Sequence, residues 1–359
     1  MKSSFLAIAA AALVAAPFSD AFVPQTVAFQ TKVIGNSPST TTALNAIGVL
    51  ARKAKEAELR TYVEGGVEEN VLEKFKEMKS AAESVELDNT PGPLQELLTK
   101  RKGTLTIIAE YKRKLENSAF IDEIFDPEIV SPTFREYGAS AVAVLADERM
   151  GGCNYDDIAK FVEEQRRAKM EVPGPLMVIS NDLIVDELQI ARSAAYGASA
   201  VTLNFALLGD EKIVEFMKFA KAIGMESIVG VATKEEAQNA INAGARIINV
   251  IGVADLDDKV AVITDLEIPE DAKVCTIGTI IGRDDKEFGE IQEAWICRDR
   301  GFNCAWVNDP LYKGGNSALE HPGAVISAMK AKSSVKWASP KARAGKGEGA
   351  REYLGDILM

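Results

Sequence analysis

The sequence is poor in the residues on which metal and histidine chemistry depend. Its 359 residues include one histidine, His321, and four cysteines, none of them in a CxxC spacing. These numbers exclude a histidine-rich metal site, a nucleophile triad built on histidine and a dense disulfide scaffold. The cysteines are therefore predicted to be buried free thiols. Any catalysis by this chain has to use lysine, aspartate and glutamate side chains.

Positive charge and phosphate-binding glycine motifs are also scarce. The 41 lysines and arginines are outnumbered by 53 aspartates and glutamates, which gives a formal net charge of -12. Nucleic acid and anionic membranes bind basic surfaces, so neither is an expected partner of the mature chain. The sequence has no GxGxxG fingerprint and no P-loop. Their absence argues against a doubly wound nucleotide-binding sheet.

The N-terminus has the composition of a targeting segment. Residues 1–21 combine one lysine with a short apolar run, as in a cleaved signal peptide, and the run is too short to span a membrane. Residues 22–45 are rich in serine and threonine and contain no acidic residue, which is typical of a transit segment. Together they resemble the bipartite presequence of algae with complex plastids. The predicted destination is the chloroplast stroma, with simple secretion as the alternative.

Two further segments flank the main domain. Residues 46–100 show helical periodicity interrupted by the pair Gly65-Gly66, which predicts N-terminal helices ahead of the domain. Residues 334–359 are basic and low in apolar residues, which predicts a flexible C-terminal tail. As an alternative, either segment could bind a protein partner in the plastid.

Between these segments, apolar strand patterns alternate with helical patterns. The sequence Tyr-Gly-Ala-Ser-Ala occurs at both 137–141 and 196–200, which indicates a repeated strand-helix unit. Continuous apolar strands joined by helices predict a parallel sheet, and eight such units predict an α/β protein with a (β/α)8 barrel over residues 101–333. The expected strands are 105–109, 141–145, 176–179, 200–205, 227–231, 247–251, 274–277 and 304–307.

The active site of such a barrel lies at the C-terminal ends of its strands. Glu110 and Lys112 follow the first apolar run, and their i, i+2 spacing predicts that both side chains point to the same face. Such a pair could exchange protons with a substrate or bind its carboxylate, or it could be a structural ion pair at the rim. Asp147 follows the second run and has the same two interpretations.

The motif that contains Glu110 and Lys112 resembles a known family. The sequence Ile-Ile-Ala-Glu-Tyr-Lys-Arg-Lys at 107–114 is similar to the first strand of indole-3-glycerol-phosphate synthases, and further landmarks match between 94 and 332, more weakly after strand six. The resemblance implies ring closure and decarboxylation of 1-(2-carboxyphenylamino)-1-deoxyribulose 5-phosphate, a step of tryptophan biosynthesis, without metal or organic cofactor. It places Glu110 and Lys112 at the family's catalytic glutamate and substrate-contacting lysine.

Other family positions are occupied by different residues. Leu115 lies where the family has a serine that binds the substrate carboxylate, Asn181 replaces the lysine that acts as general acid, and Gly230 replaces the glutamate that acts as general base. Asparagine cannot serve as an acid, and glycine has no side chain. The phosphate-binding Gly-x-Ser becomes Asn-Asp-Pro at 308–310, and Asn249 is the polar residue nearest to the family's Asn-Asn-Arg segment.

Two functions remain open from the sequence. One is a divergent synthase that acts on a small anionic substrate, and the other is a non-catalytic barrel that serves as a binding or assembly component in the plastid. For the synthase, Glu110 and Lys112 are the candidate catalytic residues. The candidate substrate-binding residues are Lys114, Asp147, Asn181, Asn249 and Asn308.

Overall fold

The computed structural model describes residues 38–100, 103–115, 121, 126–281, 288–312 and 321–331, with side chains from residue 48 onward. The predicted signal peptide at 1–21, most of the predicted transit segment at 22–45 and the basic tail at 334–359 lie outside the described residues. The helical pattern of the sequence also predicts a helix at 285–300, and its first residues, 285–287, lie outside the described ones. Among the described residues, no helix is both long enough and apolar enough to cross a membrane.

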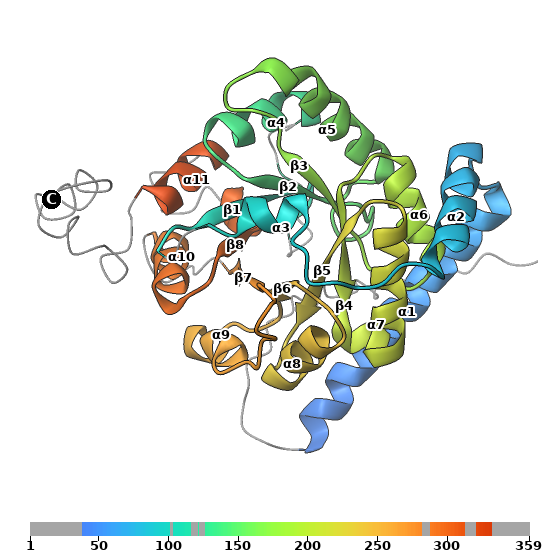
Figure 1. The fold of residues 1–359 in the computed structure, drawn as a ribbon. Helices are drawn as coiled ribbons and strands as arrows, with labels where there is room; N and C mark the ends of the chain where they lie inside the picture. The colour runs from blue at the N-terminus through green and yellow to red at the C-terminus, as the bar shows by residue number, and fades with distance from the viewer. Residues whose placement is uncertain are drawn as a thin grey trace, which may run out of the picture.

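Eight parallel strands close into a barrel in sequence order, with β8 paired to β1 (Figure 1). The predicted (β/α)8 fold is therefore confirmed. Every expected strand is present, and each observed bound lies within three residues of the expected one. The strands are β1 (Thr106–Tyr111), β2 (Ala141–Leu145), β3 (Met177–Asn181), β4 (Ala200–Asn204), β5 (Glu226–Val231), β6 (Ile247–Val250), β7 (Cys275–Ile280) and β8 (Cys304–Val307).

Layers of apolar side chains fill the barrel interior. The odd-numbered strands contribute one buried isoleucine each, Ile108, Ile179, Ile228 and Ile277, which belong to one interior cluster. This is the layer pattern expected of alternate strands in such barrels. The short helix α3 (Pro93–Leu98) closes the N-terminal end by inserting Leu94 and Leu98 into the same cluster. The bottom of the barrel is thus packed, and only its C-terminal end is left for a site.

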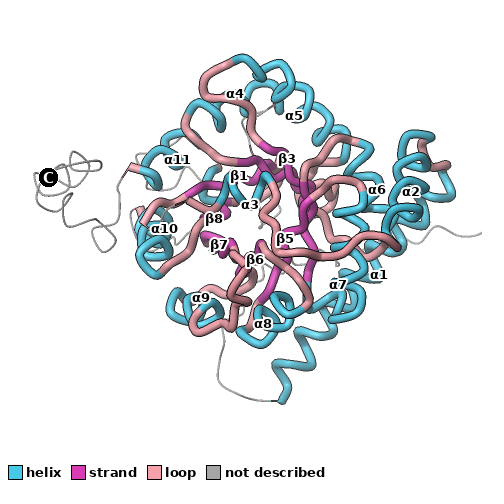
Figure 2. The backbone as a smooth tube through the Cα atoms, viewed as in Figure 1, coloured by secondary structure: helices cyan, strands magenta, loops and turns pink. Residues whose placement is uncertain are grey.

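Helices surround the barrel, and Figure 2 shows them as an outer ring. They are α4 (Pro127–Glu136), α5 (Tyr155–Arg167), α6 (Glu187–Ala195), α7 (Phe205–Ala222), α8 (Lys234–Asn242), α9 (Leu256–Ile263), α10 (Gly289–Arg300) and α11 (Pro322–Lys330). Phe205 was expected in a strand, but it begins α7 because the Asn204 side chain accepts a hydrogen bond from the Leu207 N–H and caps the helix. The eight-residue α9 was not expected from the sequence.

Two N-terminal helices pack on one side of the barrel; the periodicity of 46–100 predicted helices but not where they pack. Helix α1 (Pro38–Gly65) begins before the expected position 46, and α2 (Glu69–Ala82) lies against α6 and α7. The Arg192 guanidinium on α6 lies 3.9 Å from the ring centre of Tyr62 on α1 and 4.2 Å from that of Tyr155 on α5. These cation-π contacts attach α1 to the barrel wall.

Candidate functional site

The first cluster of polar residues lies at the C-terminal end of β1. Glu110 is in the strand, and Lys112 is the first residue after its end. The predicted common direction of their side chains is confirmed, since Lys112 Nζ lies 3.3 Å from Glu110 Oε1. Both residues are buried, with 6% and 3% of their surfaces exposed. A carboxylate and an ammonium group are therefore held together at the mouth of the barrel.

Glu110 accepts further hydrogen bonds from across the barrel. Its Oε2 accepts from Asn181 Nδ2 at 3.0 Å and from Trp306 Nε1 at 2.8 Å. The Asn181 amide is itself fixed, since its Oδ1 accepts from Thr202 Oγ1 at 3.0 Å. The Glu110 carboxylate thus has fixed donors from β3 and β8 in addition to Lys112. These bonds hold the Glu110 side chain in one orientation.

Lys112 has a second carboxylate partner, Asp309, which is the middle residue of the Asn-Asp-Pro segment at 308–310. The two side chains form an ion pair, and Asp309 is buried. The hydroxyl of Tyr312 donates to the Glu110 backbone oxygen at 2.6 Å. Burial raises the pKa of Tyr312 well above its ordinary value, so the hydroxyl stays a neutral donor. The segment after β8 therefore closes over the end of β1.

Residues 309–312 of that segment offer no backbone donors to a phosphate group. The N–H of Asp309 donates to the Asn308 side chain at 2.8 Å, and residue 310 is a proline. The N–H groups of Leu311 and Tyr312 donate to the backbone oxygens of Asn308 and Asp309. The N–H groups of residues 309, 311 and 312 are therefore bonded within the segment, and Pro310 has no N–H group. A phosphate site of the kind found at helix N-termini is not formed by these residues.

Gly230 lies inside the barrel, in register with Asn204 on β4 and Asn249 on β6. The side chain of Ile251 covers it, because a Cβ placed on Gly230 would lie 2.8 Å from Ile251 Cδ1. The position to which the resemblance assigns a general base is therefore covered by an aliphatic group from the neighbouring strand end. A longer side chain at position 230 requires Ile251 to move or to be shortened.

Gly230→Ala is expected to lower the free energy of unfolding by about 1 kcal/mol, the low end for an overpacked core, because the contacted atom is the mobile end of Ile251. Combined with Ile251→Ala, most of this cost should disappear, since the two side chains compete for one space. Urea denaturation of the two single variants and the double variant measures the coupling. Strictly additive effects would contradict the overlap.

A second cluster connects helix α1 to the ends of β2 and β3. Lys55 is 2% exposed, and its Nζ lies 2.6 Å from Asp182 Oδ1 and 3.1 Å from Asp147 Oδ2. Asp182 also accepts hydrogen bonds from the Tyr155 hydroxyl at 2.8 Å and from Gln189 Nε2 at 2.9 Å. Although burial alone would lower the pKa of Lys55, the two carboxylates raise it above its ordinary value. The ammonium therefore stays charged.

The structure brings together only part of the predicted site. Asn181 joins Glu110 and Lys112, whereas Asp147 belongs to the Lys55 cluster. Lys114 donates to the Glu148 backbone oxygen at 2.8 Å, and Asn249 accepts from Thr279 Oγ1 at 3.0 Å. Sequence reasoning missed Trp306, which strand alternation could have placed inside the barrel two residues before Asn308. It also missed Lys55, whose only signal was a lysine in an amphipathic helix.

Other candidate chemistry is absent from the part of the chain that the structure describes. No group of three or more histidine, cysteine, aspartate and glutamate side chains there could hold a metal ion. The four cysteines are free and buried, as predicted, and burial raises the pKa of Cys153 and Cys275 to about 12. At neutral pH these thiols are protonated and are poor nucleophiles.

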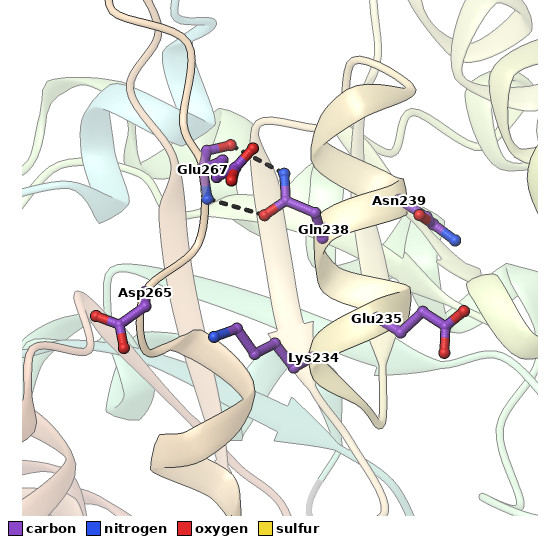
Figure 3. Close-up of a pocket in the computed structure, with 6 residues that line it drawn as sticks. All are labelled: Lys234, Glu235, Gln238, Asn239, Asp265 and Glu267. Atoms are coloured by element: carbon purple, nitrogen blue, oxygen red, sulfur yellow. Dashed lines mark hydrogen bonds between the residues drawn. The ribbon is translucent and has the colours of Figure 1, made fainter.

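A polar surface pocket lies outside the barrel, between α8 and the chain that follows α9 (Figure 3). Gln238 closes one side of it, because its amide donates to the Glu267 backbone oxygen at 3.0 Å and accepts from the Glu267 N–H at 2.8 Å. Lys234 and Asp265 line the other end. None of the sequence-predicted site residues lines this pocket. The barrel mouth therefore remains the candidate functional site.

Comparison with known proteins agrees with the geometry of the barrel. The family model described as indole-3-glycerol phosphate synthase matches residues 59–281, more than half of the chain. A protein of that name from Leptospira interrogans is 37% identical over 154 residues, which cover 43% of this chain and 57% of the relative. One from Carboxydothermus hydrogenoformans is 32% identical over 180 residues, covering 49% and 64%. The chain thus spans less than two thirds of the length of these relatives.

Proposed function

The chain belongs to the indole-3-glycerol phosphate synthase family, and from this premise we propose that its barrel binds a ligand at the mouth without catalysing the synthase reaction. The proposal rests on the two residues, Asn181 and Gly230, that occupy the family's positions for the general acid and the general base. Asn181 is held between Glu110 and Thr202 by its amide, and Gly230 is covered by Ile251. Neither position can transfer a proton.

The size of these losses supports a binding role. Removing one general acid or base typically reduces the rate by a factor of about 10² to 10⁴. Here both groups are replaced, and the backbone donors of 309–312 cannot hold a phosphate. Glu110 and Lys112 keep their contact, but the ammonium group is shared with Asp309. The pair is therefore better suited to holding the mouth in shape than to moving protons.

The second candidate function is a divergent synthase of tryptophan biosynthesis. The specific observation in its favour is the retained pair of Glu110 and Lys112, which are buried and 3.3 Å apart at the end of β1. If other residues replaced the missing acid and base, this pair could still orient a substrate carboxylate and stabilise developing charge. The two proposals differ in one measurable quantity, which is turnover of the synthase substrate.

We expect no turnover of 1-(2-carboxyphenylamino)-1-deoxyribulose 5-phosphate by the purified full chain, because the acid, base and phosphate groups are all replaced. Formation of the fluorescent indole product measures this, with the Leptospira interrogans relative as positive control. Glu110→Gln provides the matched variant, since it keeps the shape of the side chain and removes its charge. Turnover that is clearly above the buffer rate and falls in Glu110→Gln would support the synthase instead.

A further inference from the structure

Trp306 is the largest side chain in its layer of the barrel interior. The strand register places it in one layer with Ala143, Thr202 and Asn249, one step toward the mouth from the four isoleucines. Interior layers of such barrels take one residue from each alternate strand, here β2, β4, β6 and β8. Because the other three side chains are smaller, the indole ring has room to extend across the centre of the barrel.

The indole ring is buried and fixed in place. Trp306 is 3% exposed and belongs to the same apolar cluster as the isoleucines. Its Nε1 donates to Glu110 Oε2 at 2.8 Å, and Glu110 lies in the next layer toward the mouth. The ring therefore reaches from the isoleucines to the polar end of the barrel. The space beneath Glu110 is occupied by an aromatic ring of the chain itself.

This space is the part of the barrel in which a ligand that contacts Glu110 could bury an aromatic ring. Ligand pockets cover such rings with apolar side chains. The other members of the layer that contains Glu110 are Asn181, Gly230 and Thr279. Ile251 covers Gly230 at this level, but continuous apolar surface begins one layer lower, at Trp306 and the isoleucines. A buried ring next to Glu110 would therefore need the volume that Trp306 fills.

We propose that Trp306 is a specificity-determining residue, which keeps aromatic rings out of the barrel interior and restricts the mouth to ligands without a ring to bury. This inference rests on the proposed binding function and narrows the class of its ligand. The substrate of the synthase reaction carries a carboxyphenyl ring, so Trp306 lowers the affinity of the mouth for that compound. The effect is separate from that of Asn181 and Gly230, which concerns proton transfer.

Two phosphorylated compounds test the role of the ring. 1-(2-carboxyphenylamino)-1-deoxyribulose 5-phosphate carries it, and ribulose 5-phosphate has a hydroxyl group at the same carbon. In calorimetric titrations of the full chain, the parent should bind the first compound no more tightly than the second. Trp306→Ala is expected to bind the first compound at least about tenfold more tightly than the parent does, because burial of an aromatic ring contributes more than this factor. Its affinity for ribulose 5-phosphate should not change.

Three further variants separate the space from other effects, with circular dichroism to verify that each one folds. Trp306→Leu loses less packing than Trp306→Ala and should show a smaller gain in the same direction. Trp306→Phe keeps a ring in place but has no N–H group for Glu110, and it should bind like the parent chain. Trp295→Ala removes a tryptophan of the outer helix α10, whose Nε1 donates to the Met329 backbone oxygen, and should change neither affinity.

The inference is overturned if the parent chain already binds the ring-bearing compound clearly more tightly than ribulose 5-phosphate, a result that does not depend on whether any variant folds. It is also overturned if folded Trp306→Ala and Trp306→Leu show no gain, or gain equally for both compounds. Product formation by the parent chain contradicts the proposed function. Tight binding of the ring-bearing compound without product contradicts only the role of Trp306.

Discussion

Lys55→Met is expected to lower the free energy of unfolding by about 3–5 kcal/mol, the cost of leaving buried charges without their partner. Lys55 is the buried cation between Asp147 and Asp182, and all three side chains are at least 96% buried, whereas the second cation near Asp147, Arg149, is half exposed at 3.6 Å. Methionine fills a similar volume but leaves two adjacent carboxylates in a site with little water. Urea denaturation followed by circular dichroism measures the change.

Lys53→Met on the same helix is the matched control, because Lys53 is exposed. Its effect should stay within about 0.5 kcal/mol, as for most surface substitutions. If Lys55→Met were no more destabilising than this control, the ion cluster would not be what fastens α1 to the barrel. If the cluster fastens α1, the variant should be cleaved faster by a protease near residue 55 while its barrel stays folded.

The contribution of this cluster depends on pH in two directions. The carboxylates raise the pKa of Lys55, so its stabilisation is complete below the unfolded pKa and is lost as pH rises through the higher folded value. Burial alone would raise the pKa of Asp147, but Lys55 and backbone donors lower it, so its stabilisation is lost as pH falls through the lower folded value. The difference in the free energy of unfolding between the parent chain and Lys55→Met should therefore be largest near neutral pH and smaller in strong acid and in strong base.

The barrel could be predicted because its signals are local and repeated. Each buried parallel strand is a short apolar run, and most strands are followed by a helix that a side chain caps, as at Asp186 and Thr233; α10 is the exception. Helix α9 escaped prediction because eight residues give little periodicity. The exact end of β3 mattered more for the site, since Asn181 proved to be the last residue of the strand and points at Glu110.

The geometry of the site could be predicted only where it depends on residues that are close together in the sequence. Glu110 and Lys112 lie two residues apart, so strand alternation fixed their relation. Contacts between distant parts of the chain left no such signal: Lys55 meets Asp147 across 92 positions, and Trp306 meets Glu110 across 196. Likewise, the sequence showed that Gly230 lacks a side chain, but only the packed structure shows that Ile251 has taken its space.

The combined variant Asn181→Lys, Gly230→Glu, Ile251→Ala is expected to gain synthase turnover of at least about 10²-fold over the parent chain, the lower bound for restoring acid-base groups. Asn181 already points at Glu110, so a lysine there would enter the same cluster, and Ile251→Ala opens the space that a glutamate at 230 needs. Product formation from 1-(2-carboxyphenylamino)-1-deoxyribulose 5-phosphate measures the gain.

Two comparisons make this test specific. Adding Glu110→Gln should abolish the gained activity, because the family's catalytic glutamate position is then neutral. The double variant Asn181→Lys, Gly230→Glu, which keeps Ile251, should gain less turnover, because the new glutamate competes with Ile251 for one space. If the combined variant folds but forms no product, the missing acid and base are not what prevents turnover. The 309–312 segment would then be the cause. That segment keeps its N–H groups for itself in every variant, so a high Michaelis constant for the phosphorylated substrate should persist even where turnover returns.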